Sequence, residues 1–323
     1  MTEKTYLEVA VEVYARAAQS PDPLLCCVDA PGISLPGLDV PPIMLEMNYG
    51  CGSTVDPGDL RGDGPLLYVG VGGGLEALQL AYFRRRPGGV VAVDPVPEMR
   101  ECAARNLEEA ARRNPWFRTD FVRILDGTAS RLPVHDASMD LVAQNCLFNI
   151  FMEDDLRTAL SEVHRVLRPG GRFSASDPVS ERPLPEALRA NPTLRARCIS
   201  GCLTYEEYLG AIAAAGLSRL TVRSRRPYRL LVPQEHPEME SPLLLWSLEV
   251  TAEKPRRPGE KRATFTGRYA IYCGTEARLA LEDGLSLPRG MPILVSDERA
   301  SMLEGRSDFL VTPSTYGSGR ACC

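Results

Sequence analysis

The sequence predicts an α/β fold, in which a parallel sheet flanked by helices is followed by a small β-rich C-terminal appendage. From Leu66 onward, short apolar runs alternate with stretches of helical periodicity, which is typical of such a sheet. A glycine-rich turn follows the first apolar run, where a strand would pass into its helix. This alternation ends at residues 253–262, which are rich in Lys, Arg and Pro and have the composition of a solvated linker.

These patterns divide the 323 residues into three parts. Residues 1–59 are expected to hold one amphipathic helix, over residues 5–19, and then a cysteine-bearing loop punctuated by Pro and Gly. Residues 60–252 are expected to form the sheet domain. Residues 263–323 are expected to form the small β-rich domain, which ends in a cysteine pair.

The elements of the sheet domain follow from local patterns in chain order. Apolar runs bounded by turn residues predict strands over residues 66–69, 90–93, 121–125, 141–146, 172–176, 217–222 and 246–251. Helical periodicity predicts helices over residues 75–83, 97–113, 153–167 and up to residue 215. Thr204 and Glu207 form a capping box for the last of these helices. In the C-terminal domain, strands are expected over residues 269–272 and 292–295.

Charge and composition argue against several classes of protein. The net charge is −5 and the basic clusters, such as residues 84–86, are short, so sequence-independent binding to nucleic acid is not expected. Uncharged apolar runs fall far below the ~20 residues that cross a bilayer, and the N-terminus lacks the pattern of a signal peptide. Ten cysteines are too few for a disulfide scaffold. We therefore expect a cytoplasmic protein with reduced thiols and no membrane partner.

The glycine-rich turn predicts a cofactor site. Gly70, Gly72 and Gly74 let the backbone approach a ligand closely. Asp94, at the tip of the second strand, can accept hydrogen bonds from ribose hydroxyls. The Gly-x-Gly-x-Gly spacing offers less of a pyrophosphate cradle than Gly-x-Gly-x-x-Gly, which favours a nucleoside–methionine ligand over a dinucleotide. The third strand ends in an acid and backbone amides that can meet an adenine edge, namely Asp126, Gly127, Thr128 and Ala129.

Together with the Pro-Gly-Gly turn within residues 165–173, these motifs resemble the class I S-adenosylmethionine-dependent methyltransferases over roughly residues 60–250. The resemblance implies a Rossmann-like sheet that binds S-adenosyl-L-methionine. One position departs from the family pattern, because Tyr68 stands two residues before Gly70, where such enzymes usually carry an acid. The contact to the methionine amino group is therefore expected from elsewhere, such as the carbonyl groups of the loop.

Three cysteines are expected near the methyl-facing edge of this sheet. Cys146 ends the fourth strand, Cys198 lies in the segment after the fifth strand, and Cys51 sits in a glycine turn before the sheet. Three converging thiolates bind a soft ion, for which zinc and trivalent arsenic are both candidates. A closed zinc site would need a fourth ligand and usually shows Cys-x-x-Cys spacing, which is absent. As(III) suits three thiolates and keeps a lone pair that can attack a methyl sulfonium.

At these cysteines the sequence resembles the arsenite S-adenosylmethionine methyltransferases, most closely the subgroup associated with arsenosugar biosynthesis. The matching stretches are residues 24–27, 47–52, 144–146, 198–201 and 322–323. The resemblance implies that Cys51, Cys146 and Cys198 bind As(III). It also implies that Cys51 cooperates with Cys26 or Cys27 in ligation and disulfide chemistry.

The resemblance further implies roles next to the thiols. Tyr49 is expected to contact the sulfonium face of the cofactor, and Asn145 either contacts the cofactor or caps a turn. Cys202 has no assigned role. Cys322 and Cys323 are either an ordinary terminal tail or a dithiol that captures arsenite and delivers it.

The function implied is arsenic detoxification by methylation of arsenite or methylarsenite, with S-adenosyl-L-methionine as the methyl donor. A dithiol would return the oxidised arsenic to the trivalent state, and thioredoxin or glutathione would reduce the resulting disulfide. Two alternatives stay open. The first keeps the fold but uses the thiols for structural zinc, with a carbon, nitrogen or oxygen acceptor. The second is a thiol-based metalloid sensor.

Overall fold

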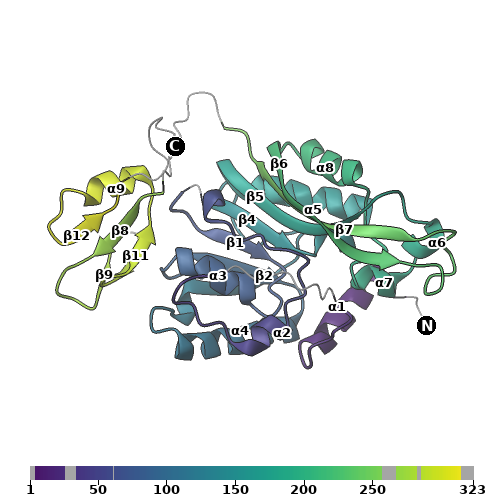
Figure 1. Cartoon of the computed structure of the whole chain (residues 1–323), viewed down its shortest axis with the longest axis horizontal. Coiled ribbons are helices and arrows are strands. Elements are labelled where there is room, and N and C mark those ends of the chain that lie inside the picture. Colours follow the sequence, from purple (N-terminus) through teal and green to yellow (C-terminus); the bar gives the residue numbers. More distant parts are fainter. Residues whose placement is uncertain (1–3, 26–33, 61, 257–266, 282–284, 314–323) are drawn as a thin grey trace, which may run out of the picture.

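The computed structural model describes residues 4–25, 34–60, 62–256, 267–281 and 285–313. A seven-stranded sheet organises the middle of the chain, in the order β3-β2-β1-β4-β5-β7-β6 (Figure 1). Its strands are β1 (Leu66–Val69), β2 (Val90–Asp94), β3 (Val122–Asp126), β4 (Met139–Asn145), β5 (Leu167–Ser180), β6 (Ser218–Leu231) and β7 (Leu243–Glu253). Strands β1 to β5 pair in parallel, whereas β7 is antiparallel to both β5 and β6. The carboxyl ends of β1 to β5 therefore share one edge of the sheet.

Helices cover both faces of this sheet. On one face lie α3 (Leu75–Phe83) and α4 (Pro97–Arg113), and on the other lie α5 (Glu153–Val166) and α8 (Tyr205–Ala214) (Figure 1). Side chains of β1 alternate between the two cores, since Leu66 and Tyr68 pack on the α3–α4 side and Leu67 and Val69 on the α5–α8 side. Burial on both faces explains why these parallel strands read as continuous apolar runs.

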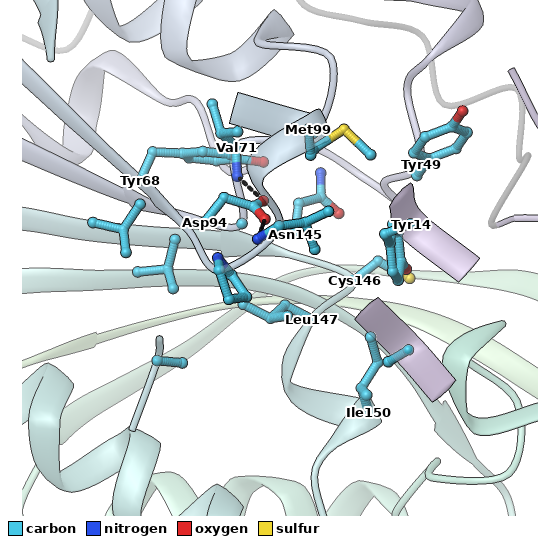
Figure 2. A pocket seen from close by; sticks show the side chains of 18 of the residues that line it. Tyr14, Tyr49, Tyr68, Val71, Asp94, Met99, Asn145, Cys146, Leu147 and Ile150 are labelled. Atoms are coloured by element: carbon cyan, nitrogen blue, oxygen red, sulfur yellow. Dashed lines mark hydrogen bonds between the residues drawn. The ribbon is translucent and has the colours of Figure 1, made fainter. Parts of the chain in front are cut away.

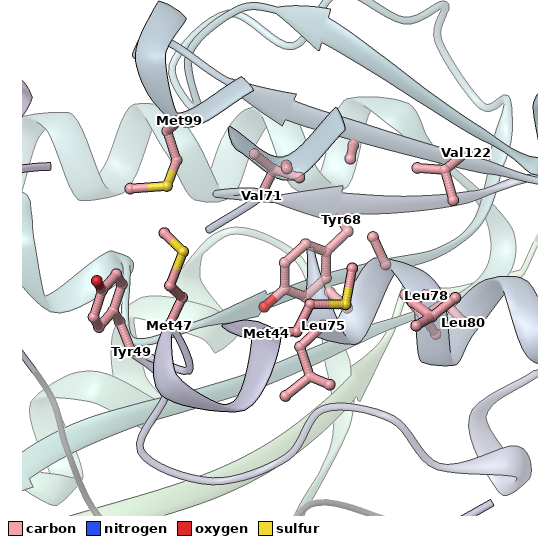
Figure 3. Packing of buried hydrophobic residues seen from close by; sticks show 14 of the residues in the cluster. Met44, Met47, Tyr49, Tyr68, Val71, Leu75, Leu78, Leu80, Met99 and Val122 are labelled. Carbon is pink, nitrogen blue, oxygen red and sulfur yellow. The ribbon is translucent and has the colours of Figure 1, made fainter. Parts of the chain in front are cut away.

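The N-terminal segment packs against the α3–α4 face. It contains α1 (Tyr6–Ala17), which begins with a capping box between Thr5 and Glu8, and the short helix α2 (Pro42–Glu46). Met44 and Met47 pack into the same core as Tyr68 and Leu75 (Figure 3). This segment also contains the 3-10 helix Pro57–Asp59. Short helices elsewhere in the chain are α6 (Glu186–Arg189), α7 (Pro192–Ala196) and the 3-10 helices Thr119–Phe121 and Phe148–Ile150.

The C-terminal unit has its own small core. Its elements are β8 (Tyr269–Tyr272), β9 (Arg278–Ala280), β10 (Ser286–Pro288), β11 (Pro292–Leu294), α9 (Asp297–Leu303) and β12 (Phe309–Val311). Strand β8 pairs antiparallel with β11 and β12, and β10 pairs antiparallel with β9. Side chains such as Ala270, Leu287 and Ile293 form a cluster separate from the two cores of the large sheet.

Each strand and helix predicted for the large sheet is present. The bounds of β1, α3 and α4 agree with those predicted, and the other elements have shifted ends. Strand β5 begins at Leu167 and takes in the Pro-Gly-Gly turn. Strands β6 and β7 pair over a longer stretch than expected, from Ser218 with Glu253 to Leu231 with Leu243. The sequence analysis missed α2 and α9, which are too short to show a clear period. Within the described ranges, no helix has the length and apolar character needed to cross a membrane.

Candidate active site

A cavity of about 220 Å³ lies at the carboxyl ends of β1, β2 and β4 (Figure 2). Its walls come from α1, the loop before β1, the glycine turn after β1, and the ends of β2 and β4. This is the edge at which open α/β sheets bind their ligands. The structure thus gathers segments far apart in sequence around one space, as expected for a cofactor site.

The glycine turn forms one wall of the cavity. Gly70, Gly72 and Gly74 have φ angles of +82°, +52° and +88°, which residues with a Cβ rarely adopt. A Cβ at Gly72 would meet no atom within 4 Å, so a ligand has room to approach the backbone there. Gly74 does not line the cavity. It caps α3, and a Cβ there would face Met44.

Asp94 lies at the end of β2, beside the glycine turn. Its carboxylate accepts hydrogen bonds from the backbone N–H of Val71, at 3.0 Å, and of Val96, at 2.9 Å (Figure 2). Burial raises the pKa of Asp94 to about 6, although these hydrogen bonds oppose the rise. The carboxylate lines the cavity where a ribose diol would reach it.

The turn after β3 contributes only part of the predicted adenine site. Gly127, Thr128 and Ala129 line the cavity. Asp126 does not, because its side chain is 76% exposed and forms an ion pair with Arg100 at 2.9 Å. The backbone of this turn, not the acid, therefore faces the cavity.

Helix α1 closes the side of the cavity opposite the glycine turn. Leu7, Val11 and Tyr14 line it, and Tyr14 makes an edge-to-face contact with Tyr49 at a ring-centroid distance of 6.3 Å. The Tyr49 hydroxyl donates to the carbonyl of Ala17, at 3.2 Å, which ties the segment before the sheet to this helix. The predicted sulfonium contact, Tyr49, thus lies in the cavity wall.

Cys146 follows β4 directly and adopts a left-handed conformation, with φ +57°. The Gln144 side chain accepts a hydrogen bond from the N–H of Leu147, at 3.1 Å, and holds the turn closed around Cys146. Cys146 lines the cavity (Figure 2). Non-glycine residues in this region are strained, and such strain gathers at functional sites.

Cys198 adopts the same left-handed conformation as Cys146 and lies beside it. Its φ is also +57°, its side chain is fully buried, and its thiol donates to the carbonyl of Cys146 at 3.1 Å. The hydroxyl of Tyr14 lies 4.0 Å from the Cys198 sulfur. Of the four non-glycine residues described with positive φ, two are therefore these adjoining cysteines.

Cys51 lies next to the same turn, held by Asn145. The Asn145 side chain accepts from the N–H of Cys51, at 3.0 Å, and donates to the carbonyl of Gly52, at 2.9 Å. A Cβ at Gly50 would come within 2.4 Å of the Asn145 side chain, so the loop requires glycine there. The Cys51 sulfur is 3.4 Å from the hydroxyl of Ser176. Asn145, predicted either to cap a turn or to contact the cofactor, clamps the Cys51 loop and also lines the cavity.

The three thiols are near each other but do not form an assembled site. Cys51 and Cys198 are buried behind the cavity wall, and only Cys146 lines it. Within the described part of the chain, no group of three or more His, Cys, Asp or Glu residues is arranged to hold a metal ion. Cys26 and Cys27 lie outside the described residues, as do Cys322 and Cys323.

Several residues at the site were missed by the sequence analysis. The hydroxyl of Tyr14 faces Cys198, and Glu76 lines the cavity. Ser176 lies beside Cys51. The apolar stripe of α1 was recognised, but a stripe does not reveal whether it faces a core or a ligand. Cys202, whose role was open, donates to the carbonyl of Cys198 at 3.4 Å, and burial raises the pKa of its thiol.

The chain is similar to several known methyltransferases. A family model described as a methyltransferase domain matches residues 67–175. An arsenite methyltransferase of Halobacterium salinarum is 26% identical over 212 residues, which cover 66% of this chain and 52% of that protein. An arsenite methyltransferase of Aquipseudomonas alcaligenes is 32% identical over 164 residues, covering 50% of this chain and 45% of that protein. The chain therefore spans about half the length of these curated relatives.

A solved structure also resembles the whole chain. An arsenic(III) S-adenosylmethionine methyltransferase from Chlamydomonas reinhardtii superposes with a TM-score of 0.57 and 23% identity, covering 97% of this chain and 99% of that one. At this identity the likeness concerns the fold. With the matched domain, it confirms the predicted fold class, an α/β sheet of the class I methyltransferase type with extra β-rich strands at the C-terminus.

Proposed function

We propose that this chain, whose large sheet is a class I methyltransferase fold, transfers the methyl group of S-adenosyl-L-methionine to trivalent arsenic bound by cysteine thiolates. One observation carries the proposal. Cys146 and Cys198 adjoin each other in strained backbone, and Cys146 lines the cofactor cavity. The similarity to proteins named arsenite methyltransferases supports the same acceptor.

The cavity wall supplies groups for each part of the cofactor. The backbone of Gly70 and Gly72 leaves room for the ligand, and Asp94 accepts from the ribose hydroxyls. The turn of residues 127–129 meets the adenine edge, and Tyr49 approaches the sulfonium. Because hydrogen bonds hold Asp94 and Tyr49 in the cavity wall, these groups can help to fix the direction in which the methyl group points.

The thiols would hold arsenic at the end of β4. Cys198 would turn its sulfur from the carbonyl of Cys146, and Cys51 would turn its sulfur from Ser176, toward an ion that they share with Cys146. Thiolates are the ligands that soft ions prefer. We place As(III) at Cys51, Cys146 and Cys198, beside the cavity.

When bound, S-adenosyl-L-methionine supplies an electrophilic methyl group, which the arsenic lone pair takes while the electrons of the broken S–C bond stay on sulfur. Arsenic is thereby oxidised from the trivalent to the pentavalent state. We propose that Cys51 and either Cys26 or Cys27 return two electrons to arsenic by forming a disulfide. Thioredoxin or glutathione would reduce that disulfide, and the cytoplasm keeps such thiols reduced.

The test is arsenic speciation after incubation of the protein with S-adenosyl-L-methionine, arsenite and a thiol reductant. We expect methylated arsenic from the parent, and a rate at least ~100-fold lower from Cys146→Ser and Cys198→Ser, since both lose a ligand that positions arsenic. Cys273→Ser is the matched control, because Cys273 is exposed and lies in the C-terminal unit. Without reductant, turnover should stop once the protein's own thiols are oxidised.

Two results would contradict this proposal. The first is a parent that binds both ligands but makes no methylated arsenic, which would favour a metalloid sensor or another acceptor. The second is methylation by Cys146→Ser and Cys198→Ser at the parent's rate, which would place arsenic elsewhere.

A further inference from the structure

The end of the cavity that would hold the methionine part of the cofactor lacks an acid on the sheet itself. Asp94 and residues 127–129 mark the ribose and adenine end, so the methionine part extends past Gly70 toward Cys146. Tyr68 is the residue that β1 contributes there, and burial raises the pKa of its phenol well above the usual value, which keeps it neutral. An α-ammonium group placed here would find no anion on β1.

Glu76, the second residue of α3, places a carboxylate at this end. Its side chain lines the cavity and the residue is only 6% exposed. Thr54 holds both carboxylate oxygens, since its N–H donates to Oε1 and its hydroxyl donates to Oε2, each at 2.8 Å. Tyr68 and Asn145 also interact with the carboxylate, so Glu76 is fixed between the glycine turn and the Cys51 loop.

Hydrogen-bond donors surround this carboxylate, but no cation among the described residues balances its charge. Among the described residues, no Lys, Arg or His forms an ion pair with Glu76, and its neighbours Thr54, Tyr68 and Asn145 are all uncharged groups. Burial raises the pKa of Glu76, because the low-dielectric surroundings disfavour its charged form. A buried carboxylate normally has a cation or several donors to compensate for lost water. A cation supplied by the ligand would balance the charge of Glu76.

We infer that Glu76 binds the α-ammonium group of the methionine part of S-adenosyl-L-methionine and so replaces the acid that is missing at position 68. This inference rests on the proposed use of that cofactor. The ammonium offers three N–H donors. Thr54 takes two of the roughly four acceptor sites of the carboxylate, and the ammonium would take a further site in place of the uncharged donor group of Tyr68 or Asn145. Tyr68, in turn, fills the space that an acid on β1 would occupy, and its hydroxyl helps to orient the Glu76 carboxylate.

Two ligands that differ in the amino-acid part test this role by titration calorimetry. S-adenosylhomocysteine carries the ammonium group, whereas 5′-methylthioadenosine keeps the adenosine and sulfur but lacks it. For Glu76→Gln we expect S-adenosylhomocysteine to bind about 10- to 100-fold more weakly, the range for a charge-assisted hydrogen bond, with 5′-methylthioadenosine changed less than ~2-fold. Glu98→Gln is the matched control, because Glu98 is the second residue of α4, is exposed, and does not line the cavity.

The inference is overturned if Glu76→Gln leaves both affinities unchanged, or if it weakens both ligands equally, which would indicate general damage to the cavity. A crystal structure of the parent with S-adenosylhomocysteine decides the matter even if the variant does not fold. The amino nitrogen should lie within hydrogen-bonding distance of a Glu76 carboxylate oxygen, and contacts to backbone carbonyls alone would contradict the assignment. A parent that binds neither ligand would instead refute the proposed use of the cofactor.

Discussion

At the scale of single residues, the left-handed backbone of Cys146 and Cys198 is the most informative feature of the site. For a residue with a Cβ, this conformation costs about 1 to 2 kcal/mol relative to the right-handed region. Glycine would remove that cost at both positions, yet each holds a thiol, and the Cys198 thiol donates to the Cys146 carbonyl. The strain is therefore consistent with thiols whose position matters more than local stability.

The clamp between Asn145 and the Cys51 loop gives a prediction for glycine. Gly50→Ala would bring a Cβ within 2.4 Å of the Asn145 side chain, so the loop must shift and carry Cys51 with it. We expect the variant to lose about 1 to 3 kcal/mol of stability, as overpacking does, and most of its arsenite methylation.

The control for this prediction is Gly210→Ala. A Cβ at Gly210, within α8, meets no atom within 4 Å. It should therefore stabilise the protein by up to about 1 kcal/mol, because alanine favours helix, and leave methylation unchanged. Thermal unfolding measures the stability of each variant, and methylation assays measure its rate. Equal stability and equal rates in Gly50→Ala and Gly210→Ala would contradict the proposed role of the Asn145 clamp.

Asp94 predicts how cofactor binding depends on pH. In the proposed function, its ionised form accepts hydrogen bonds from the ribose hydroxyls. Burial raises the pKa of Asp94 to about 6, so below that pH the free protein carries a proton there that would oppose binding. Affinity for S-adenosylhomocysteine should be constant above about pH 7 and fall by up to about 10-fold per pH unit below about pH 6. Titration calorimetry across this range tests it. Asp94→Asn should bind weakly at every pH, and an unchanged slope in this variant would assign the titration to another group.

At the scale of elements, helix α1 is part of the site as well as of the core. Ala10, Val13 and Ala17 are buried, while Leu7 and Val11 line the cavity and stay partly exposed. One helix face thus serves packing and the adjoining face serves a ligand. The sequence predicted the helix from its apolar spacing, but the same spacing describes a helix that only packs.

Hydrogen exchange at α1 provides the next prediction. Binding of S-adenosylhomocysteine should slow amide exchange in Tyr6–Ala17, because the ligand would fill the cavity that Leu7, Val11 and Tyr14 line. Exchange in α8, Tyr205–Ala214, should not change, since none of its residues lines the cavity. Mass spectrometry of peptides from both helices provides the measurement. Equal protection of the two would mean that the ligand stabilises the whole fold and not α1 specifically.

Most elements of the sheet could be predicted because their cause is local. Burial on both faces makes β1 apolar throughout and β2 apolar up to Asp94, and the Thr204–Glu207 capping box marks where α8 begins. The site was only partly predictable, because its contacts join distant segments. Nothing in the neighbouring sequence shows that Asn145 reaches Cys51, that Cys198 lies on Cys146, or that Asp126 points to solvent.

At the scale of the whole molecule, the C-terminal unit docks on the α3 side of the large sheet. Arg299 forms an ion pair with Asp63 at 3.0 Å, and the N–H of Ser286 donates to the carbonyl of Arg85 at 2.9 Å. The Cζ atom of Arg85 lies over the rings of Tyr82 and Trp116, 4.6 and 4.5 Å from their centroids. These contacts lie away from the cavity, whose lining comes from residues 7–151.

Removing residues 257–323 should therefore leave the cofactor site in place. We expect the shortened chain to bind S-adenosylhomocysteine within ~3-fold of the parent, since residues that share no contacts usually act independently. If Cys322 and Cys323 deliver arsenite, methylation at low arsenite will slow in the same variant. Unchanged kinetics there would exclude delivery, and loss of cofactor binding would show that the two units depend on each other.

A single turnover with S-adenosyl-L-methionine labelled in its methyl group tests methyl transfer to arsenic most directly. Reduced protein is mixed with the labelled cofactor and arsenite, and the products are separated and identified by mass. We predict that the label appears on arsenic in step with the formation of S-adenosylhomocysteine, and that neither forms when arsenite is omitted. Label on another acceptor, or intact cofactor in protein that has bound arsenite, would contradict the proposed function.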